Sequence, residues 1–223
     1  EFIDRPNRFL TRVRLDGKIV DSHLPDPGRL KELLKPGSKV LVKKENGLNR
    51  KTRYSTQMVY QDNQLISVNT LLPNLFVKKL LENRSLEQFS DWELIQSEKT
   101  FGNSRFDFYL KKGNDELILE VKSVTLVKDE IAMFPDAVTA RGSKHLKHLI
   151  ELAQKGYKTA VLFVVQRNDA KYFIANADCD PEFAKNLKLA TESNVQVHII
   201  KIDVYPEKLI YSGKLPLKFD KIG

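Results

Sequence analysis

Residues 105–122, RFDFYLKKGNDELILEVK, decide both the fold and the candidate site of this chain. Two runs with alternating side chains flank Gly113-Asn114, a pair that suits a two-residue hairpin turn because glycine takes positive φ without strain. A turn centred on this pair places Asp107 opposite Glu120. Because side chains alternate along a strand, one face of the hairpin is predicted to carry Arg105, Asp107, Tyr109, Ile118, Glu120 and Lys122, and the other, apolar face Phe106, Phe108, Leu110, Leu117, Leu119 and Val121.

The opposed carboxylates of Asp107 and Glu120 predict a metal site. Directly paired residues have Cβ atoms about 5 Å apart, where like charges repel. A hard, oxygen-liganded cation such as Mg²⁺ (or Mn²⁺) would relieve the repulsion, with the backbone carbonyl of Val121 as a further ligand. Lys122, on the same face, could orient an attacking water and stabilise charge on a phosphate. The alternative is that both carboxylates are solvated and Lys122 only forms a salt bridge.

The bulk composition is that of a globular protein. A chain of 223 residues with 41% hydrophobic and 30% charged residues can form one large or two modest domains. The single cysteine, Cys179, excludes an internal disulfide framework, which fits a reducing compartment. No apolar run approaches the ~18–20 residues needed to span a bilayer, and the first residues lack the features of a secretory signal. We therefore expect a cytoplasmic protein without a membrane partner.

The positive charge is concentrated in the first third of the chain. The net charge is +8, and residues 1–68 hold 14 Lys and Arg against 8 Asp and Glu. Such a balance favours an anionic partner, with nucleic acid as the first candidate. A basic surface that serves only solubility is the alternative.

Residues 1–69 are predicted to form a small β-barrel of the oligonucleotide-binding (OB) type. Alternating runs separated by turn residues indicate strands at 8–15, 18–21, 39–43, 55–60 and 64–68, and a short helix is predicted at 29–34. An unrelated small barrel is the alternative.

Residues 70–223 alternate helices with strands. Helices are predicted at 75–86, with apolar positions 75, 76, 80 and 81, at 139–154, and from Asp180-Pro181 onward; strands are predicted at 92–98, 105–124, 159–165, 172–174 and 195–203. This order describes an α/β sandwich with a mixed sheet, so that the whole chain is α/β (α+β overall).

Three groups of basic residues are candidate phosphate contacts. The predicted helix at 139–154 carries Arg141, Lys144, His145 and His148; a loop within 43–54 carries Lys43, Lys44, Arg50, Lys51 and Arg53; and a proline-rich turn is flanked by His23 and Arg29. All of them could instead face solvent. Zinc at the two helix histidines is disfavoured because no cysteine or third histidine lies near in sequence.

Five segments of the sequence resemble the sugar fermentation stimulation protein family. They are Glu120-Val-Lys-Ser-Val-Thr-Leu126, Phe134-Pro-Asp-Ala-Val-Thr-Ala-Arg-Gly-Ser-Lys-His-Leu146, Arg105-Phe-Asp107, Val68-Asn-Thr70 and His23-Leu-Pro-Asp-Pro-Gly-Arg29. The last segment departs from the family pattern, because Asp26 stands where such proteins commonly have Asn.

The resemblance implies an OB-like N-terminal domain, a C-terminal domain of the PD-(D/E)XK nuclease type, and DNA binding. The motif residues of that superfamily would fall on Asp107, Glu120 and Lys122, and the family name implies a link to the regulation of sugar metabolism. Our first hypothesis is a largely sequence-independent DNA-binding protein with a Mg-dependent deoxyribonuclease site. The rival is a non-catalytic DNA-binding regulator that uses the nuclease-like fold as a scaffold. The oligomeric state is open, with a homodimer among the expected assemblies.

Overall fold

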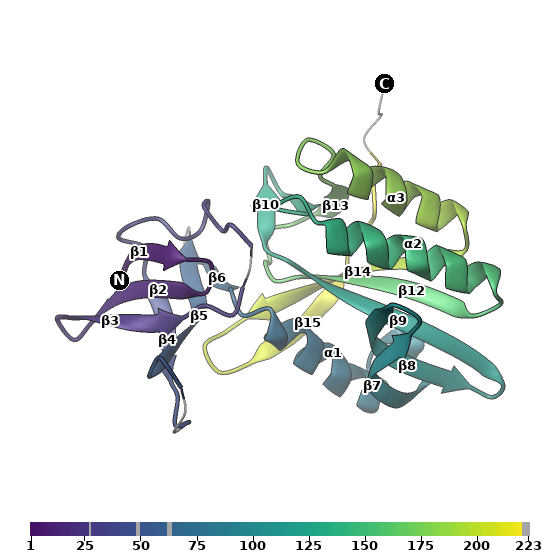
Figure 1. Cartoon of the computed structure of the whole chain (residues 1–223), viewed down its shortest axis with the longest axis horizontal. Coiled ribbons are helices and arrows are strands. Elements are labelled where there is room, and N and C mark those ends of the chain that lie inside the picture. The colour runs from purple at the N-terminus through teal and green to yellow at the C-terminus, as the bar shows by residue number, and fades with distance from the viewer. Residues whose placement is uncertain (27, 48–49, 62–63, 220–223) are drawn as a thin grey trace.

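Six strands form a curled N-terminal sheet in this computed structural model, which describes residues 1–26, 28–47, 50–61 and 64–219 (Figure 1). The strands are β1 (Phe2–Asn7), β2 (Leu10–Leu15), β3 (Lys18–His23), β4 (Val40–Lys44), β5 (Tyr54–Gln61) and β6 (Gln64–Ser67). Their order is β1-β2-β3-β5-β4, with β6 paired to β5. Only the β3–β5 pair is parallel. Below, β1–β6 are called the N-terminal domain.

The N-terminal sheet is OB-like without being a closed barrel. The backbone of Phe2 donates to Ser38 O (2.7 Å) and accepts from Gly37 N (2.9 Å), which ties β1 to the segment that enters β4. Among the described residues no strand pairing joins β1 to β4. The expected OB-like architecture is therefore confirmed, whereas barrel closure is not observed, and β1 was not predicted.

The prediction of a short helix at 29–34 was wrong. The segment contains one hydrogen-bonded turn, from Leu34 N to Leu30 O (2.8 Å), and Leu30 has a positive φ of 50°. The run between Gly28 and Pro36 is too short to offset the cost of starting a helix. The leucines of this segment nevertheless contribute to packing: Leu30, Leu33 and Leu34 are buried in the core of the N-terminal domain.

A six-stranded mixed sheet forms the C-terminal domain. The strand order is β15-β14-β12-β9-β8-β7, with β9, β12 and β14 parallel to one another. The bounds are β7 (Glu93–Phe101), β8 (Ser104–Lys112), β9 (Asp115–Val124), β12 (Lys158–Val165), β14 (Val195–Val204) and β15 (Leu209–Lys214). A smaller sheet contains β10 (Leu126–Lys128), β11 (Ile131–Phe134) and β13 (Tyr172–Ala175).

Helices cover both faces of the large sheet. Helices α2 (Ala140–Gln154) and α3 (Pro181–Glu192) lie on one face, and α1 (Leu71–Glu82) lies on the other, followed by the 3₁₀ turn η1 (Glu87–Phe89) (Figure 1). Two separate hydrophobic cores result, one on each face. This arrangement confirms the predicted α/β sandwich with a mixed sheet. No helix within the described residues is long and apolar enough to cross a membrane.

Local sequence signals fix the starts of α2 and α3. Thr139 Oγ1 accepts a hydrogen bond from Gly142 N (3.1 Å), and Asp180 Oδ1 accepts one from Phe183 N (2.9 Å). Pro181 occupies the first turn of α3, where its missing N–H costs nothing. Both predicted helix starts are confirmed.

Two predicted side-chain faces were wrong. Helix α1 begins at Leu71 and buries Val77 and Leu81, so that Leu75, expected in the core, is 57% exposed. Phe106 packs on the α2 side of the sheet instead of the α1 side, with its ring centroid 5.4 Å from that of His145. The alternation of β8 is interrupted between Phe106 and Phe108, beyond the last regular β8–β9 pair, and Glu98 on the neighbouring strand β7 has a positive φ of 57°. The strands β10, β11 and β15 were also not predicted.

Candidate functional site

The β8–β9 hairpin brings Asp107 and Glu120 together at the end of its regular pairing. The pairs run from Lys112–Asp115 to Phe108–Leu119, so the turn lies at Gly113-Asn114 as predicted. Beyond the last pair the two strands are joined through the Asp107 side chain, because its Oδ2 accepts a hydrogen bond from Val121 N (2.7 Å). The side chain is therefore fixed beside Glu120 by the strand that carries Glu120.

Asp107 also accepts a hydrogen bond from helix α1. Asn74 Nδ2 donates to Asp107 Oδ1 at 2.7 Å. Each carboxylate oxygen thus receives one N–H donor and retains a lone pair for another partner.

Glu120 has one satisfied oxygen and one free oxygen. Its Oε1 lies 2.5 Å from Lys122 Nζ and 2.5 Å from His145 Nδ1. Its Oε2 is buried and has no hydrogen-bond partner among the described residues. A buried, unpartnered carboxylate oxygen is costly, and a bound cation is one way to satisfy it.

The two carboxyl groups have opposite pKa shifts. Burial, followed by repulsion from Glu120, raises the pKa of Asp107 to about 7. Burial also opposes ionisation of Glu120, but the charge of Lys122 and the hydrogen bond from His145 hold the pKa of Glu120 below its ordinary value. Asp107 therefore ionises only at a higher pH than an ordinary aspartate, and a cation between the two groups would favour its ionised form.

This donor set fits a hard divalent cation. Asp107 and Glu120 provide carboxylate oxygens, one of them unpartnered, and Val121 lies with both in the lining of one cleft. No cluster of three or more His, Cys, Asp or Glu residues suited to a metal occurs in the part of the chain that the structure describes. Any ion at this site would need ligands beyond the two carboxylates, such as the predicted Val121 carbonyl.

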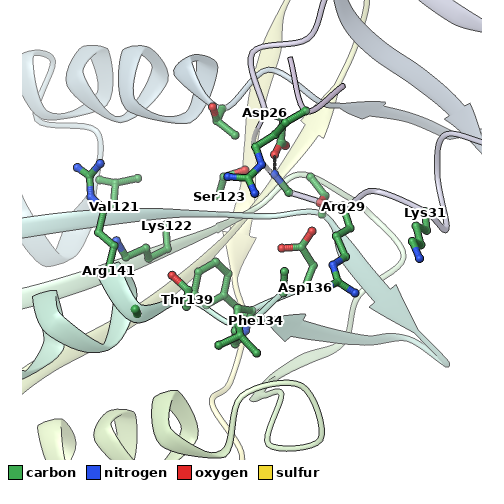
Figure 2. Close-up of a pocket in the computed structure, with 18 of the residues that line it drawn as sticks. Asp26, Arg29, Lys31, Val121, Lys122, Ser123, Phe134, Asp136, Thr139 and Arg141 are labelled. Atoms are coloured by element: carbon green, nitrogen blue, oxygen red, sulfur yellow. Dashed lines mark hydrogen bonds between the residues drawn. The ribbon is translucent and has the colours of Figure 1, made fainter. Parts of the chain in front are cut away.

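The cleft lies between the two domains and has a volume of about 1050 Å³. One wall is the N-terminal turn with Asp26, Arg29 and Lys31; the other is the segment from Phe134 to Arg141, and Val121, Lys122 and Ser123 lie between them (Figure 2). Six basic residues line the cleft, namely Arg5, Arg8, Arg29, Lys31, Lys122 and Arg141. Two further carboxylates, those of Asp26 and Asp136, line it as well, so that basic groups from both domains outnumber the acidic ones around the carboxylate pair.

Arg5 fixes the N-terminal wall. Its guanidinium donates to four backbone carbonyls, those of Arg8 (2.6 Å), Asp26 (2.8 Å), Gly28 (2.7 Å) and Arg29 (2.8 Å). These bonds hold the turn in one conformation. They use both terminal nitrogens of Arg5, whereas its Nε is buried and has no partner among the described residues, so that its role is to shape the wall rather than to contact a ligand.

The structure separates the predicted phosphate contacts of α2. Exposed Arg141 lines the cleft, whereas Lys144 and His148 line a second pocket of about 610 Å³ on the outer side of the helix. His145 cannot contact phosphate as predicted, because it is buried (4% exposed) and bonded to Glu120. The i, i+4, i+7 spacing of Arg141, His145 and His148 predicts one basic stripe on α2, but packing against Phe106 of β8 and Glu120 of β9 buries His145, the middle residue.

Of the other predicted phosphate contacts, only one lines the cleft. Arg29 lines the cleft, but His23 does not. Lys43 and Lys44 at the end of β4, and Arg50, Lys51 and Arg53 in the β4–β5 loop, are exposed and do not line the cleft either; these five are called the loop residues below. Pro27 of the proline-rich turn and Leu48 and Asn49 of the loop lie outside the described residues.

Sequence reasoning missed four residues of the site. Asn74 is the first polar residue of a helix that begins Leu-Leu-Pro-Asn-Leu-Phe, and this isolated amide was an available signal. Arg5 and Arg8 flank Pro6-Asn7 in a segment that was not recognised as a strand, and Lys31 lies in the segment wrongly predicted as helical. Their convergence depends on contacts between distant parts of the chain.

Comparisons with known proteins agree over both domains. Residues 3–68 match the family model described as SfsA N-terminal OB domain, and residues 71–208 match the one described as sugar fermentation stimulation protein RE domain. The sugar fermentation stimulation protein homolog of Clostridium kluyveri is 47% identical over 220 residues (98% of this chain, 95% of that protein). The homolog of Clostridium botulinum strain Alaska E43 is 44% identical over 219 residues (98% and 95%).

A solved structure, that of Pyrococcus furiosus SfsA in complex with Ca²⁺, superposes with a TM-score of 0.91 at 29% identity and covers 97% of this chain and 94% of that one. Both family models and the curated relatives extend over the two domains described above. The chain belongs to the sugar fermentation stimulation protein family.

Proposed function

We propose that this protein binds DNA largely without regard to sequence and hydrolyses its phosphodiester bonds with Mg²⁺ or Mn²⁺. The observation that carries the proposal is the Asp107–Glu120 pair, with its free buried Oε2, at the base of a cleft lined by six basic residues. Phosphate contacts from Arg and Lys provide affinity that is independent of base sequence.

Asp107, Glu120 and the Val121 carbonyl are the proposed metal ligands. A bound Mg²⁺ or Mn²⁺ would polarise the scissile phosphate and promote ionisation of the attacking water. The relative of known structure that was solved with Ca²⁺ supports a divalent cation in this family. Asn74 and His145 are proposed to orient the two carboxylates, as hydrogen-bond partners of metal ligands commonly do.

Lys122 is the proposed catalytic cation. Its side chain is 13% exposed and its Nζ is bonded to Glu120 Oε1 in the cleft. From there the ammonium group can orient a water and stabilise the developing charge on a phosphate oxygen. Arg29 and Arg141, which approach from opposite walls, are proposed to hold the phosphates of the substrate strand.

We further propose that residues 1–69 and 70–223 act as two domains in the cytoplasm. The basic N-terminal domain would supply much of the DNA affinity, and the C-terminal domain would act on the strand held in the cleft between them. The single cysteine is in keeping with a reducing compartment.

A cleavage assay tests the proposal. Labelled DNA should be cut in the presence of Mg²⁺ or Mn²⁺ but not of chelator, and Glu120→Gln and Lys122→Ala should each reduce the rate by orders of magnitude with little change in DNA affinity. Glu116→Gln is the matched control, because Glu116 lies on the same strand but bonds Tyr109 outside the cleft. Binding without any metal-dependent cleavage would favour the scaffold hypothesis.

A further inference from the structure

Gln166, directly after β12, is fully buried beneath the cleft floor and bonds one of the residues that line it. Its side-chain Nε2 donates to Ser123 Oγ at 2.8 Å. Its backbone N–H donates to Val124 O (2.9 Å), which extends the β9–β12 pairing by one bond. The next residue, Arg167, donates to Gln61 Oε1 of the N-terminal domain (3.0 Å). The segment that carries the Gln166 amide is therefore fixed to both domains.

Packing alone does not explain an amide at position 166. The Oε1 atom of Gln166 is buried and has no hydrogen-bond partner among the described residues. Such an oxygen destabilises the folded state, and a leucine of similar size would avoid that cost. In the part of the chain that the structure describes, Ser123 is the one side chain bonded to this amide. What the amide provides is its bond to Ser123.

Ser123 presents a hydroxyl group to the cleft from a different side than Lys122 presents its ammonium group. Both residues line the cleft (Figure 2). Val121 packs in the core on the α1 face of the sheet and Val124 in the core on the α2 face, so by alternation Ser123 points to the α1 face and Lys122 to the α2 face. The hydroxyl is therefore placed for a part of the substrate other than the phosphate held at Lys122.

The bond from Gln166 leaves the hydroxyl hydrogen of Ser123 unused. A serine hydroxyl has one hydrogen to donate and two lone pairs that accept. The Gln166 amide occupies one lone pair, and Ser123 Oγ donates to no acceptor among the described residues. Because the hydrogen cannot point at a donating amide on the buried side, it is directed toward the cleft. A phosphate oxygen is a strong acceptor for it there.

We propose that Ser123 donates a hydrogen bond to the phosphate next to the scissile one, and that Gln166 is the positioning residue for this hydroxyl. The inference rests on the proposed function and adds to it one substrate contact and the residue that orients it.

Binding and turnover of Ser123→Ala test the contact. Anisotropy in chelator with the labelled DNA of the cleavage assay should show affinity about 10- to 100-fold weaker, the range of one hydrogen bond to a charged group. With Mg²⁺ the variant should raise KM by a larger factor than it lowers kcat, the reverse of Lys122→Ala. Ser123→Thr retains the hydroxyl and should bind far more tightly than Ser123→Ala. Ser97→Ala is the matched control, because Ser97 is a half-buried strand serine outside the cleft.

A double-mutant cycle tests the role of Gln166. Gln166→Leu should weaken DNA binding about 3- to 10-fold, the range of one neutral hydrogen bond, and should have no effect in a Ser123→Ala background. Its melting temperature should stay close to that of the wild type, because the amide removed has an unpartnered oxygen. If Gln166→Leu does not fold, the comparison of Ser123→Ala with Ser123→Thr still decides whether the hydroxyl binds the substrate.

Three results would contradict the account in distinct ways. Equal DNA affinity of Ser123→Ala and Ser97→Ala would overturn this inference and leave the proposed function intact. An equal effect of Gln166→Leu in both backgrounds would show that Gln166 is only structural. Failure of the wild type to bind DNA would overturn the proposed function and this inference with it.

Discussion

The β4–β5 loop and the interdomain cleft both carry concentrated positive charge, but they present it differently. The loop and the adjoining end of β4 carry Lys43, Lys44, Arg50, Lys51 and Arg53 in a short sequence segment, with every side chain exposed. The cleft collects its basic residues from distant parts of both domains around two carboxylates. Charge that is clustered in sequence is suited to attracting a polyanion, whereas charge that converges in space is suited to positioning one phosphate.

The loop should make the larger contribution to affinity. Neutralising its five basic residues to Gln should weaken binding to every DNA sequence alike, by orders of magnitude at low salt. Each lost phosphate contact should lower the slope of log affinity against log salt by ~0.7–0.9. Anisotropy across a salt series measures both effects.

A variant with five exposed lysines neutralised elsewhere is the matched control: Lys158, Lys171, Lys185, Lys188 and Lys208. It has the same net charge as the loop variant. Equal slopes in the two variants would show that only net charge matters, and an unchanged slope in the loop variant would move the DNA surface to the cleft and α2.

The cleft should control metal affinity, which the loop should not affect. Asn74→Ala removes the donor to Asp107 Oδ1 and should lower Mn²⁺ affinity about 10- to 100-fold, as loss of a hydrogen-bond partner of a metal ligand typically does. Calorimetric titration of this variant and of the loop variant is the test. Wild-type metal affinity in Asn74→Ala would assign Asn74 a packing role only.

Arg29 should affect cleavage more than affinity. Arg29→Ala removes one exposed cleft cation out of many basic groups, so the salt slope should fall by only ~0.7–0.9. The cleavage rate at saturating DNA should fall further than this, because a poorly positioned phosphate reacts slowly. Lys31→Ala, in the same wall, gives the comparison; a purely electrostatic role would make the two variants alike in both assays.

The smallest effect concerns proton linkage at Asp107. Its pKa is raised from 3.8 to about 7, so the folded state holds a proton that the unfolded state releases between these values. In chelator, this contribution to stability is fully present below about pH 4 and is lost as pH rises through about 7. Asp107→Asn should remove that part of the pH dependence of the melting temperature. A variant that keeps the full wild-type dependence would contradict the assignment.

Local signals in the sequence were sufficient for much of the fold. Gly113-Asn114 set the hairpin register that brings Asp107 beside Glu120 just beyond the last regular pair, and Thr139 and Asp180 marked two helix starts. These features depend on residues close in the chain. The face of Phe106 could not be predicted, because the alternation of β8 breaks between Phe106 and Phe108, where its regular pairing with β9 has ended.

The cleft could not be predicted from the sequence, because it is formed by contacts between residues that are far apart in the chain. Arg5 bonds carbonyls of the turn up to 24 positions away, and Asn74 reaches Asp107 across 33 positions. His145 was placed on a basic stripe by its helical spacing, but the identity of its neighbour, Glu120, is decided by how α2 packs on the sheet. The sequence therefore identified the carboxylate pair and the lysine, whereas the residues that hold and surround them required the structure.

The central claim, that Asp107 and Glu120 share one divalent cation, is tested most directly by isothermal titration calorimetry of the metal-free protein with Mn²⁺ and Mg²⁺. We expect one site per chain in the wild type and in Glu116→Gln, and loss of that site in both Asp107→Asn and Glu120→Gln. Unchanged binding in either of these two variants, or no binding to the wild type at millimolar metal, would contradict the account.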